Sequence, residues 1–456
     1  MATCLKILIV GLITWLKICS KNTVLSITEN VIPPEMKAQI DQLILEVMEK
    51  EKIPAQSLSI VKKDGSLLYN RGYGDRDVEH NLPAGPETLF AIGSATKSFT
   101  AVLVAKTLHE MYPAMGKNVL DVPIRELAPG YNFTLGDRFR SERVTFKDIL
   151  AHRVCIKQEV SGLVSQAFNG TEDMVNRFRY SPEECGFRSE FSYNNGLIGM
   201  AGHILGHIAN TTYADLLSEF VGQLGMTSTT VIKMSNDHEN MMHRAIPYIW
   251  KGGEFVRGNS EFLKSIAPIP SGGGILTNAN DMAKYMLFHL NKGKVGDVQV
   301  VPDEVMGWER TGHGGHLPPF MTSFYMYPNL GQGIFTSRSG SLVDPEGLSN
   351  AIFHIISEGE KDAAPPLSKS THLHDCSVTK CHHYKTRHSL STPHLHDVGV
   401  TDCHQANASP PIPPVATFLF LHALIASPRD TRISLSHILL NQAEFDQPLP
   451  LGNVLN

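Results

Sequence analysis

The chain has 456 residues, of which 42% are hydrophobic and 19% are charged, and its formal net charge is −5. This length exceeds that of one small domain, and the composition is that of a folded globular protein. The small negative charge gives no indication of binding to nucleic acid or to an anionic membrane surface. A small-molecule or peptide substrate is therefore the expected partner, and the oligomeric state stays open.

Residues 1–20 have the pattern of a secretory signal peptide. Lys6 precedes the apolar run Ile7–Leu16, and Lys17 and Ile18–Ser20 follow it. The run is too short to span a bilayer stably, so we expect a cleaved signal and a secreted, extracellular protein with no other membrane segment. An uncleaved signal anchor is the alternative. Sequons of the form N-x-S/T predict a glycoprotein. They lie at Asn132, Asn169, Asn210 and Asn407.

The next elements in chain order are a helix, a hairpin and a longer helical region. Apolar residues at helical spacing predict a helix over Met36–Lys50. Two strands, Leu58–Val61 and Leu67–Tyr73, flank a turn signal at residues 63–66. Ser94 opens an apolar helix, and helices and loops continue to about residue 268, among them the small-residue helix Gly196–His207.

The following segment returns to strands. Ser271–Gly274 predicts a tight turn, and Asn278 is placed to cap a helix over Asp281–His289. A second hairpin is expected from Met321–Tyr327 and Gly333–Ser337, with a Pro-Asn turn between them. Asn350–Glu358 predicts a closing helix.

Strands thus lie at both ends of the region 30–360, with helices between them. We expect an α+β fold in which residues 30–93 and 269–360 build one antiparallel sheet flanked by helices. Residues 94–268 are expected to form a helical insertion domain.

Residues 364–456 differ in composition from the rest of the chain. This part holds ten of the 21 histidines among Pro, Ser and Thr, and a short pattern repeats from His372–His382 to His394–His404. We expect a disordered, low-complexity tail or an artefact of the gene model. The alternative is that its Cys and His side chains bind a soft divalent metal.

A Ser-x-x-Lys pattern marks the candidate nucleophile. Residues three apart on a helix share a face, so the lysine amine can reach the serine hydroxyl. The pattern starts at Ser59, Ser94 and Ser377, but Ser59 lies in a predicted strand, where residues three apart face opposite sides, and Ser377 lies in the tail. Only Ser94, with Lys97 behind it, opens an apolar helix.

Two further short motifs have weak signals by themselves. In Tyr193-Asn194-Asn195, a tyrosine near an ammonium can have a lowered pKa and act as a base, and the amide can orient a substrate. A buried structural tyrosine at a loop-to-helix corner is the alternative. His313-Gly314-Gly315 would let a substrate backbone approach a strand, although such a triplet is usually only a turn.

The three motifs in this order resemble the class C β-lactamase-like and penicillin-binding-protein family of serine β-lactamase-related proteins. Phe90–Thr100 looks like the family's nucleophile segment, Phe191–Asn195 is similar to its second motif, and His313–Gly315 stands where the family has Lys-Thr-Gly or His-x-Gly. Further matching segments are Asp121–Ile124, Thr145–His152 and Gly272–Asp281. The resemblance covers roughly residues 30–360 and implies a β-lactamase/transpeptidase-like fold.

The resemblance also implies a reaction. Ser94 would form an acyl-enzyme with an ester, amide or peptide, Lys97 and Tyr193 would move its proton, and which of the two is the base stays open. Asn195, His313 and Gly315 would contact the substrate. The backbone N–H groups of Ser94 and His316 would form the oxyanion hole, and no metal or cofactor is needed.

The chain departs from the family pattern in three places. Cys155 stands where the family usually has a glycine that adopts φ > 0 cheaply. The connection from Pro302 to Gly314 is short, which predicts a poorly supported third motif, and the histidine-rich tail has no counterpart in the family core. A catalytically impaired, β-lactamase-like binding protein is therefore the alternative function. Cys155 and Cys185 are able to pair in an oxidising compartment.

Overall fold

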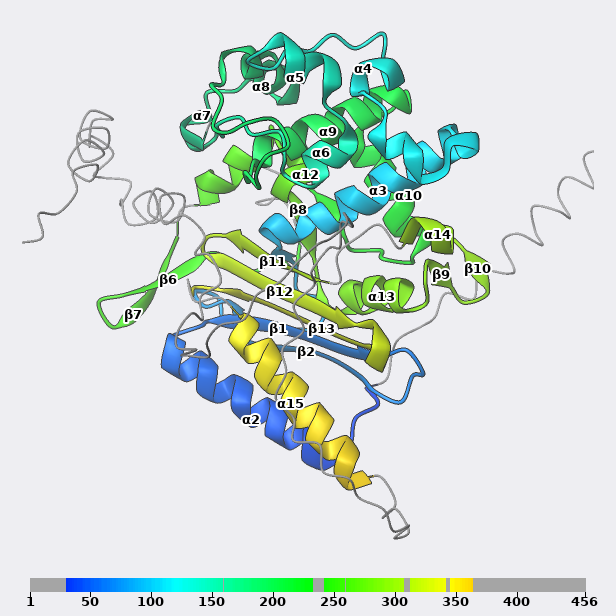
Figure 1. Cartoon of the computed structure of the whole chain (residues 1–456). Coiled ribbons are helices and arrows are strands. Elements are labelled where there is room, and N and C mark those ends of the chain that lie inside the picture. Colours follow the sequence, from blue (N-terminus) through cyan, green and yellow to red (C-terminus); the bar gives the residue numbers. More distant parts are fainter. Residues whose placement is uncertain are drawn as a thin grey trace, which may run out of the picture.

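The computed structural model describes residues 30–158, 160–232, 242–258, 260–306, 312–341 and 345–363. The predicted signal peptide, the sequon at Asn407 and the histidine-rich tail lie outside these residues. Within the described part, a sheet with two helices on its outer face carries a mostly helical half on its other side (Figure 1).

The main sheet joins the two ends of the described chain. Its strand order is β11-β12-β13-β1-β2-β3, and each neighbouring pair is antiparallel. The strands are β1 (Ala55–Lys62), β2 (Leu68–Asp77), β3 (Leu82–Pro83), β11 (Gly312–Leu317), β12 (Phe320–Tyr327) and β13 (Gln332–Ser339). The pairings β1–β2 and β12–β13 confirm both predicted hairpins. Strand β1 also pairs with β13 over its whole length, which joins the two hairpins in one sheet.

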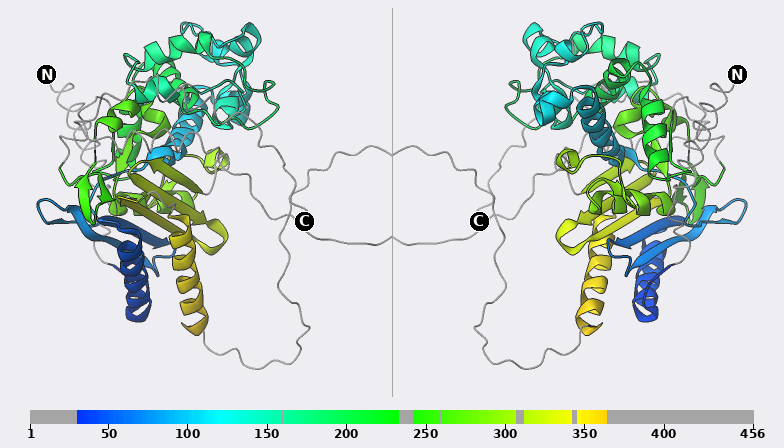
Figure 2. Two further views of the ribbon diagram at one scale, coloured as in Figure 1. Left: turned by 90° about the vertical axis from the view of Figure 1, so that its left-hand side faces the viewer. Right: turned by 90° about the vertical axis from the view of Figure 1, so that its right-hand side faces the viewer.

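Two helices cover the outer face of the main antiparallel sheet. These are α2 (Pro34–Glu51) and α15 (Glu346–Ala363), which lie next to each other in all views (Figures 1 and 2). Helix α2 buries its i, i+4 residues Met36, Ile40, Ile44 and Met48 against Ile352 and Ile356 of α15 and against the sheet. Both predicted helices are confirmed, and α15 is longer than the expected Asn350–Glu358.

The inner face packs on a larger apolar core that contains the central helices. These are α3 (Thr96–Met111), α9 (Asn195–Ile208), α10 (Tyr213–Gln223) and α13 (Ala279–Leu290). The predicted cap of α13 is confirmed, since the Asn278 side chain accepts a hydrogen bond from the Asp281 N–H at 2.9 Å. Helix α3 runs through the core below the site, with its buried Phe99 stacked on Tyr285 of α13.

Shorter elements complete the described part. The helical ones are η1 (Gly93–Ala95), η2 (Pro113–Asp121), α4 (Ile124–Leu127), α5 (Arg138–Arg143), α6 (Phe146–Leu150), α7 (Val160–Val164), α8 (Thr171–Arg177), η3 (Phe178–Tyr180), η4 (Ser260–Ile266), α12 (Pro270–Gly273), α14 (Asp303–Met306) and η5 (Pro328–Leu330). The short strands are β4 (Phe90–Ala91), β5 (Thr230–Val231), β6 (Tyr248–Lys251), β7 (Glu254–Arg257), β8 (Ile275–Thr277), β9 (Lys294–Val295) and β10 (Val298–Gln299).

The region 94–268, expected to be mostly helices and loops, also contains the short strands β5, β6 and β7: β5 pairs with β8, and β6 and β7 form a separate hairpin. One local expectation is wrong. Ser271–Gly274 is not a simple tight turn, because Pro270–Gly273 form the single helical turn α12. Among the described helices, none combines the length and apolarity needed to cross a bilayer.

Candidate active site

Ser94 lies in the short turn η1, where strand β4 passes into helix α3. Gly93 has φ 51°, and a Cβ at this position would lie 2.9 Å from the backbone of His316 on β11. A glycine is therefore needed here both for the backbone conformation and for the close approach of the sheet edge. The turn places Ser94 at the start of α3, as the sequence predicted, with Lys97 one turn further on.

Four side chains predicted from the sequence meet at this point. The Ser94 Oγ lies 2.6 Å from the Tyr193 hydroxyl and 2.9 Å from the Lys97 Nζ. The same Nζ donates to the Asn195 Oδ1 at 2.6 Å and to the carbonyl oxygen of Gly272 at 2.6 Å. The structure thus brings together Ser94, Lys97, Tyr193 and Asn195.

The Gly272 carbonyl reaches Lys97 because helix α12 packs closely on α3 and α9. The Thr100 hydroxyl of α3 donates to the carbonyl of Ser271 at 2.7 Å, and the Ser271 hydroxyl donates to the carbonyl of Ile198 in α9 at 2.9 Å. A Cβ on Gly272 would lie 2.9 Å from the Asn195 carbonyl oxygen. Gly272 therefore allows close packing between α12 and α9.

Tyr193 lies at the corner where a loop enters α9. Asn194 caps this helix, since its side chain accepts a hydrogen bond from the Leu197 N–H at 3.0 Å. The Tyr193 side chain is 37% exposed, but its hydroxyl faces Ser94 and its ring lies 4.9 Å from the Lys97 Nζ. The alternative of a purely structural, buried tyrosine does not fit this position.

Burial sets the proton affinities of the site. It lowers the pKa of Lys97 to about 7, so the amine is partly neutral near neutral pH. Although Tyr193 is 37% exposed, desolvation of its phenol by the surrounding protein raises its pKa to about 12, and the hydrogen bond with Ser94 offsets this only in part. The expectation of a lowered tyrosine pKa is wrong, because desolvation of the phenolate outweighs the hydrogen bond with Ser94.

The third motif lies on the edge strand β11, which pairs with β12 from Gly312 to Leu317. This pairing supports the motif despite the short connection before it. A Cβ on Gly315 would overlap the carbonyl oxygen of Ile92, so this glycine lets the strand pack on the Ser94 segment and not on a substrate. His313 is half-buried, with its Nδ1 in hydrogen-bond contact with the Gly314 carbonyl, and the exposed His316 borders the site.

A small pocket of about 60 Å³ opens beside Ser94. Its wall combines apolar side chains with a few polar ones, and no carboxylate is among the lining residues that the structure describes. The lining side chains include Leu163, Ile266, Ile269 and Leu317 on the apolar side and Gln158, Asn195 and His316 on the polar side.

Three groups near the site were not predicted from the sequence. The His152 ring lies 4.5 Å from that of Tyr193, Gln158 accepts a hydrogen bond from the Asn195 N–H, and Gly272 offers its carbonyl to Lys97. Burial, followed by the charges of Lys97 and His313, lowers the pKa of His152 to about 3. His152 and Gly272 lie in segments that match the family pattern, and this match was the signal by which the sequence could have identified them.

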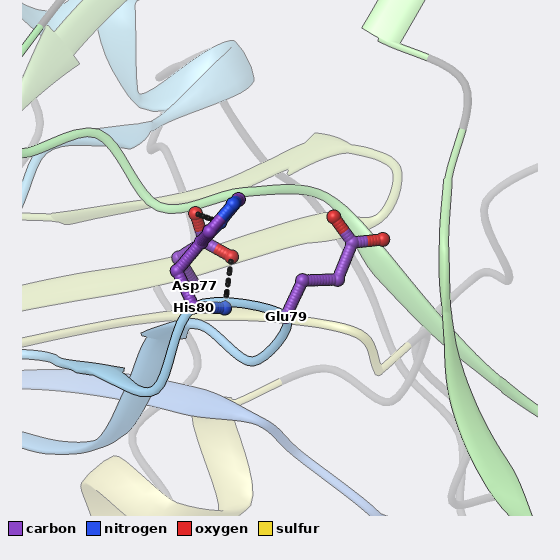
Figure 3. Close-up of side chains that lie close together, drawn as sticks. All are labelled: Asp77, Glu79 and His80. Carbon is purple, nitrogen blue, oxygen red and sulfur yellow. Dashed lines mark hydrogen bonds and ion pairs between the residues drawn. The ribbon is translucent and has the colours of Figure 1, made fainter.

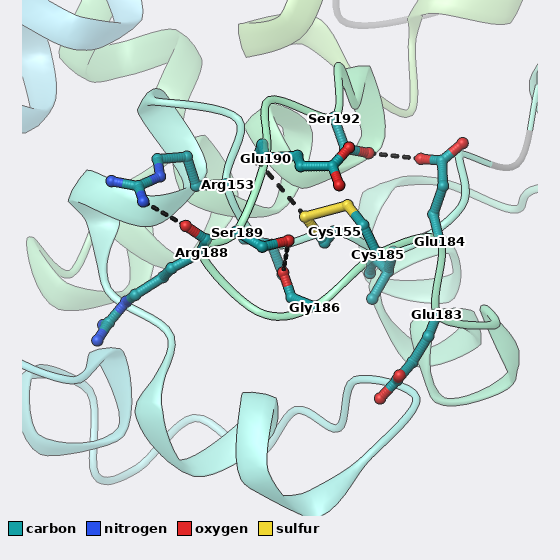
Figure 4. Close-up of a disulfide and its surroundings, with 12 residues drawn as sticks. Arg153, Cys155, Glu183, Glu184, Cys185, Gly186, Arg188, Ser189, Glu190 and Ser192 are labelled. Atoms are coloured by element: carbon teal, nitrogen blue, oxygen red, sulfur yellow. Dashed lines mark hydrogen bonds between the residues drawn. A yellow bond between two sulfur atoms is a disulfide. The ribbon is translucent and has the colours of Figure 1, made fainter.

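Cys155 and Cys185 form a disulfide with a Cα–Cα distance of 5.0 Å, as the sequence allowed (Figure 4). Cys155 has φ 60°, so it adopts the left-handed conformation that the family's glycine would adopt more cheaply. The substitution is therefore accommodated by the fold.

Within the described residues, one group of potential metal ligands brings its donor atoms within 4.8 Å of one another, namely Asp77, Glu79 and His80 (Figure 3). These atoms have protein partners. The Asp77 carboxylate contacts the His80 Nδ1 at 2.8 Å and accepts from the Tyr248 hydroxyl at 2.9 Å, while Glu79 pairs with Arg257 at 3.4 Å. The group is separate from the pocket beside Ser94.

An antiparallel sheet whose edge strand packs on a serine, with a lysine and a tyrosine in contact with that serine, defines the β-lactamase/transpeptidase-like class of folds. A family model described as Beta-lactamase matches residues 40–355, which is more than half of the chain. The chain belongs to the β-lactamase family, and the resemblance seen in the sequence is confirmed.

Solved structures agree on the fold. The octameric penicillin-binding protein homologue from Pyrococcus abyssi superposes with a TM-score of 0.58 at 23% identity, over 71% of this chain and 77% of that one. The class C beta lactamase from Rhodobacter sphaeroides gives a TM-score of 0.53 at 17% identity, over 70% of this chain and 99% of that one.

Curated relatives have a similar, low level of sequence identity. Protein flp of Staphylococcus aureus is 27% identical over 265 residues, which are 56% of this chain and 49% of that protein. An unguisins hydrolase of Aspergillus campestris is 22% identical over 364 residues, which are 71% of this chain and 65% of that protein. The chain thus spans about half the length of the first of these relatives.

Proposed function

We propose that this protein is a secreted serine hydrolase that forms an acyl-enzyme on Ser94 with ester, amide or peptide substrates. The observation that carries the proposal is the double contact of the Ser94 Oγ, at 2.9 Å from the Lys97 Nζ and 2.6 Å from the Tyr193 hydroxyl. Membership of the β-lactamase family and a relative named as a hydrolase support the same reaction class.

Lys97 is the base in this proposal. A neutral amine uses two N–H groups for the Asn195 Oδ1 and the Gly272 carbonyl and turns its lone pair toward the Ser94 hydroxyl. A pKa of about 7 leaves a large neutral fraction at physiological pH. As the Ser94 Oγ bonds to the substrate carbonyl carbon, its proton passes to Lys97.

Tyr193 is the acid. With a pKa of about 12 the phenol keeps its proton at neutral pH and can give it to the leaving oxygen or nitrogen as the tetrahedral intermediate collapses. The proton held by Lys97 then returns to the phenolate through the shared contacts. Backbone N–H groups of Ser94 and His316, which border the same pocket, are the proposed donors to the oxyanion.

Water completes the cycle. It attacks the acyl carbonyl, gives its proton to Lys97, and the acid leaves as Ser94 recovers a proton. Asn195 and His313 keep their proposed roles in substrate contact, Asn195 through its position beside Ser94 and His313 through its place on the edge strand. Every step uses a group of the chain, so the proposal includes no metal or cofactor.

The pocket limits the acyl group. Its volume of about 60 Å³ is far below the roughly 300–1,000 Å³ of pockets that enclose whole drug-sized ligands. Leu163, Ile266 and Leu317 make one side of it apolar. We therefore propose short, uncharged acyl groups, with the leaving group extending toward solvent.

Intact-mass analysis after treatment with a fluorophosphonate probe tests the proposal. We expect one covalent adduct per chain, mapped to Ser94, and none on Ser94→Ala, which removes only the nucleophilic oxygen. Tyr193→Phe should slow hydrolysis of an amide about 10²-fold or more, and of a p-nitrophenyl ester much less, since nitrophenolate leaves without an acid. A folded protein with no adduct would establish the alternative, a β-lactamase-like binding protein.

Secretion and glycosylation belong to the same proposal. The described sequon residues Asn132, Asn169 and Asn210 are exposed, and the disulfide Cys155–Cys185 suits an oxidising compartment. Expression in mammalian cells should deliver the protein to the medium with a mass that falls on enzymatic removal of N-glycans. Retention in the cytosol would contradict this part.

A further inference from the structure

The loop that carries Tyr193 has little structure of its own. Residues 181–194, between η3 and α9, contain neither helix nor strand, and most of their side chains are exposed. Tyr193 nevertheless has to hold its hydroxyl 2.6 Å from the Ser94 Oγ. Something outside the loop must therefore fix its path.

The loop lies along residues 152–157 and takes its backbone contacts from them. A β-bridge joins Ile156 and Glu183. The hydrogen bonds run from Lys157 N–H to Pro182 O (2.9 Å), Glu184 N–H to Cys155 O (3.1 Å), Arg188 N–H to Arg153 O (2.9 Å) and Ser192 N–H to His152 O (2.7 Å). Segment 152–157 is thus the support on which the Tyr193 loop rests.

One covalent bond joins the loop to this support. Cys155 lies fully buried in the middle of the supporting segment, and Cys185 lies half-buried in the loop, eight positions before Tyr193 (Figure 4). Two arginines also hold the loop: Arg188 pairs with Asp148 at 2.7 Å but is 44% exposed, and the buried Arg140 pairs with Glu183 and donates to the Cys185 carbonyl at 2.5 Å. Among these links the disulfide is the covalent one, and it joins the loop directly to the supporting segment 152–157.

We propose that the Cys155–Cys185 disulfide positions Tyr193, so that hydrolysis depends on the thiol–disulfide state of this pair. The inference rests on the proposed function, because it concerns the efficiency of the proton transfer through Tyr193. With the bond broken, the loop keeps its hydrogen bonds but samples wider positions, and the hydroxyl leaves Ser94 for part of the time.

The reducing reaction is an ordinary thiol–disulfide exchange. A thiolate of a dithiol reductant attacks the more accessible Cys185 Sγ, and Cys155 leaves as a thiolate that takes up a proton. The second thiol of the reductant then displaces Cys185, so that two electrons reduce one disulfide to two thiols and the reductant becomes a disulfide.

The test compares oxidised and dithiothreitol-reduced full-length protein, with rates normalised to Ser94 sites titrated by a fluorophosphonate. We expect kcat for an amide substrate to fall by tenfold to a hundredfold on reduction, with KM changed less than twofold, and to recover on reoxidation. Cys155→Gly, which suits the φ of 60°, should fold and behave like the reduced protein.

Two controls isolate the positioning role. Cys185→Ser should be insensitive to dithiothreitol, which separates this pair from the chain's other cysteines. In Tyr193→Phe, reduction should cause no further loss in the residual labelling rate of Ser94, because the two changes act through one group. A loss of folding alone would reduce the number of titrated sites and leave the normalised kcat unchanged.

The possible failures are distinguishable. An oxidised protein that does not label at Ser94 defeats the proposed function itself. An oxidised protein that labels and hydrolyses, with the same normalised kcat after complete reduction, overturns only the positioning role of the disulfide. Equal losses on reduction in wild type and in Tyr193→Phe would do the same.

Discussion

The imidazole of His152 lies against the phenol ring of Tyr193, with ring centroids 4.5 Å apart and planes inclined by 36°. The His152 Nδ1 also accepts a hydrogen bond from the N–H of Asn194, at 3.2 Å. Because Asn194 caps α9 and is fully buried, this one side chain supports both the ring of Tyr193 and the start of the helix behind it.

Substitution of His152 tests this support. His152→Ala removes the ring and leaves the buried N–H of Asn194 without an acceptor, at a residue with φ 53°, so we expect a loss of about 2–4 kcal/mol in the free energy of unfolding. His152→Asn tolerates that φ and can still accept the hydrogen bond, so it should lose less. Urea denaturation compares them, and equal losses would argue against the hydrogen bond.

The same histidine predicts a dependence of stability on pH. Burial, together with Lys97 and His313, lowers its pKa to about 3 from the ordinary 6.5, so between these values the unfolded chain binds a proton that the folded one does not. Its contribution to stability is present above pH 6.5 and is lost as pH falls toward 3, on the order of 5 kcal/mol in all. The difference between wild type and His152→Asn should shrink over this range.

The pKa of Lys97 predicts a dependence of activity on pH. The base must be neutral, so kcat/KM should rise about tenfold per unit below pH 7 and level off above it. The acid Tyr193, with a pKa of about 12, adds no descending limb below about pH 11. Lys97→Arg, which stays charged, should lose the rising limb and most activity. A midpoint near the ordinary lysine value of 10.5 would contradict the assignment of the base.

Local patterns predicted the elements whose signals are local. The apolar spacing of α2, the turn between β1 and β2, and the capping residue Asn278 all act within a few positions of the chain, and the structure confirms them. Glycine was less informative. The run Ser271–Gly274 has the composition of a turn, but Gly272 allows contact with α9, a neighbour about 75 positions earlier.

In the candidate site, too, the sequence predicted local geometry but not what depends on tertiary packing. The motif spacing predicted Ser94 and Lys97 as neighbours because three positions on one helix fix that geometry. The sequence predicted a lowered pKa for Tyr193, whereas the pKa is raised, because desolvation depends on which other segments cover the phenol. His152 and the Gly272 carbonyl reach the site only through tertiary packing, so residue types alone did not identify them.

Adjacent glycines on the edge strand allow a matched test of how β11 meets the nucleophile. Gly315→Ala would place its Cβ on the carbonyl oxygen of Ile92, two residues before Ser94, whereas the Cβ of Gly314→Ala would find its nearest neighbour, the Thr322 carbonyl oxygen, at 3.9 Å. We expect Gly315→Ala to lose about 1–3 kcal/mol of stability and most hydrolysis, and Gly314→Ala to retain both. Thermal denaturation and ester hydrolysis measure the pair, and similar behaviour of the two variants would show that strand and nucleophile segment are not tightly packed.

The pocket beside Ser94 predicts a preference for short acyl chains. With about 60 Å³ between Leu163, Ile266 and Leu317, p-nitrophenyl acetate and butyrate should be hydrolysed efficiently and the octanoate poorly. Leu163→Ala removes three carbon atoms from the wall and should raise kcat/KM for the octanoate relative to the acetate by about tenfold, the scale set by a few buried methylenes. Val164→Ala, on the same short helix α7 but outside the pocket lining, is the control and should keep the wild-type ratio. An octanoate preference already present in the wild type would mean that the pocket does not hold the acyl group, and that the acyl chain leaves the site in the direction proposed for the leaving group.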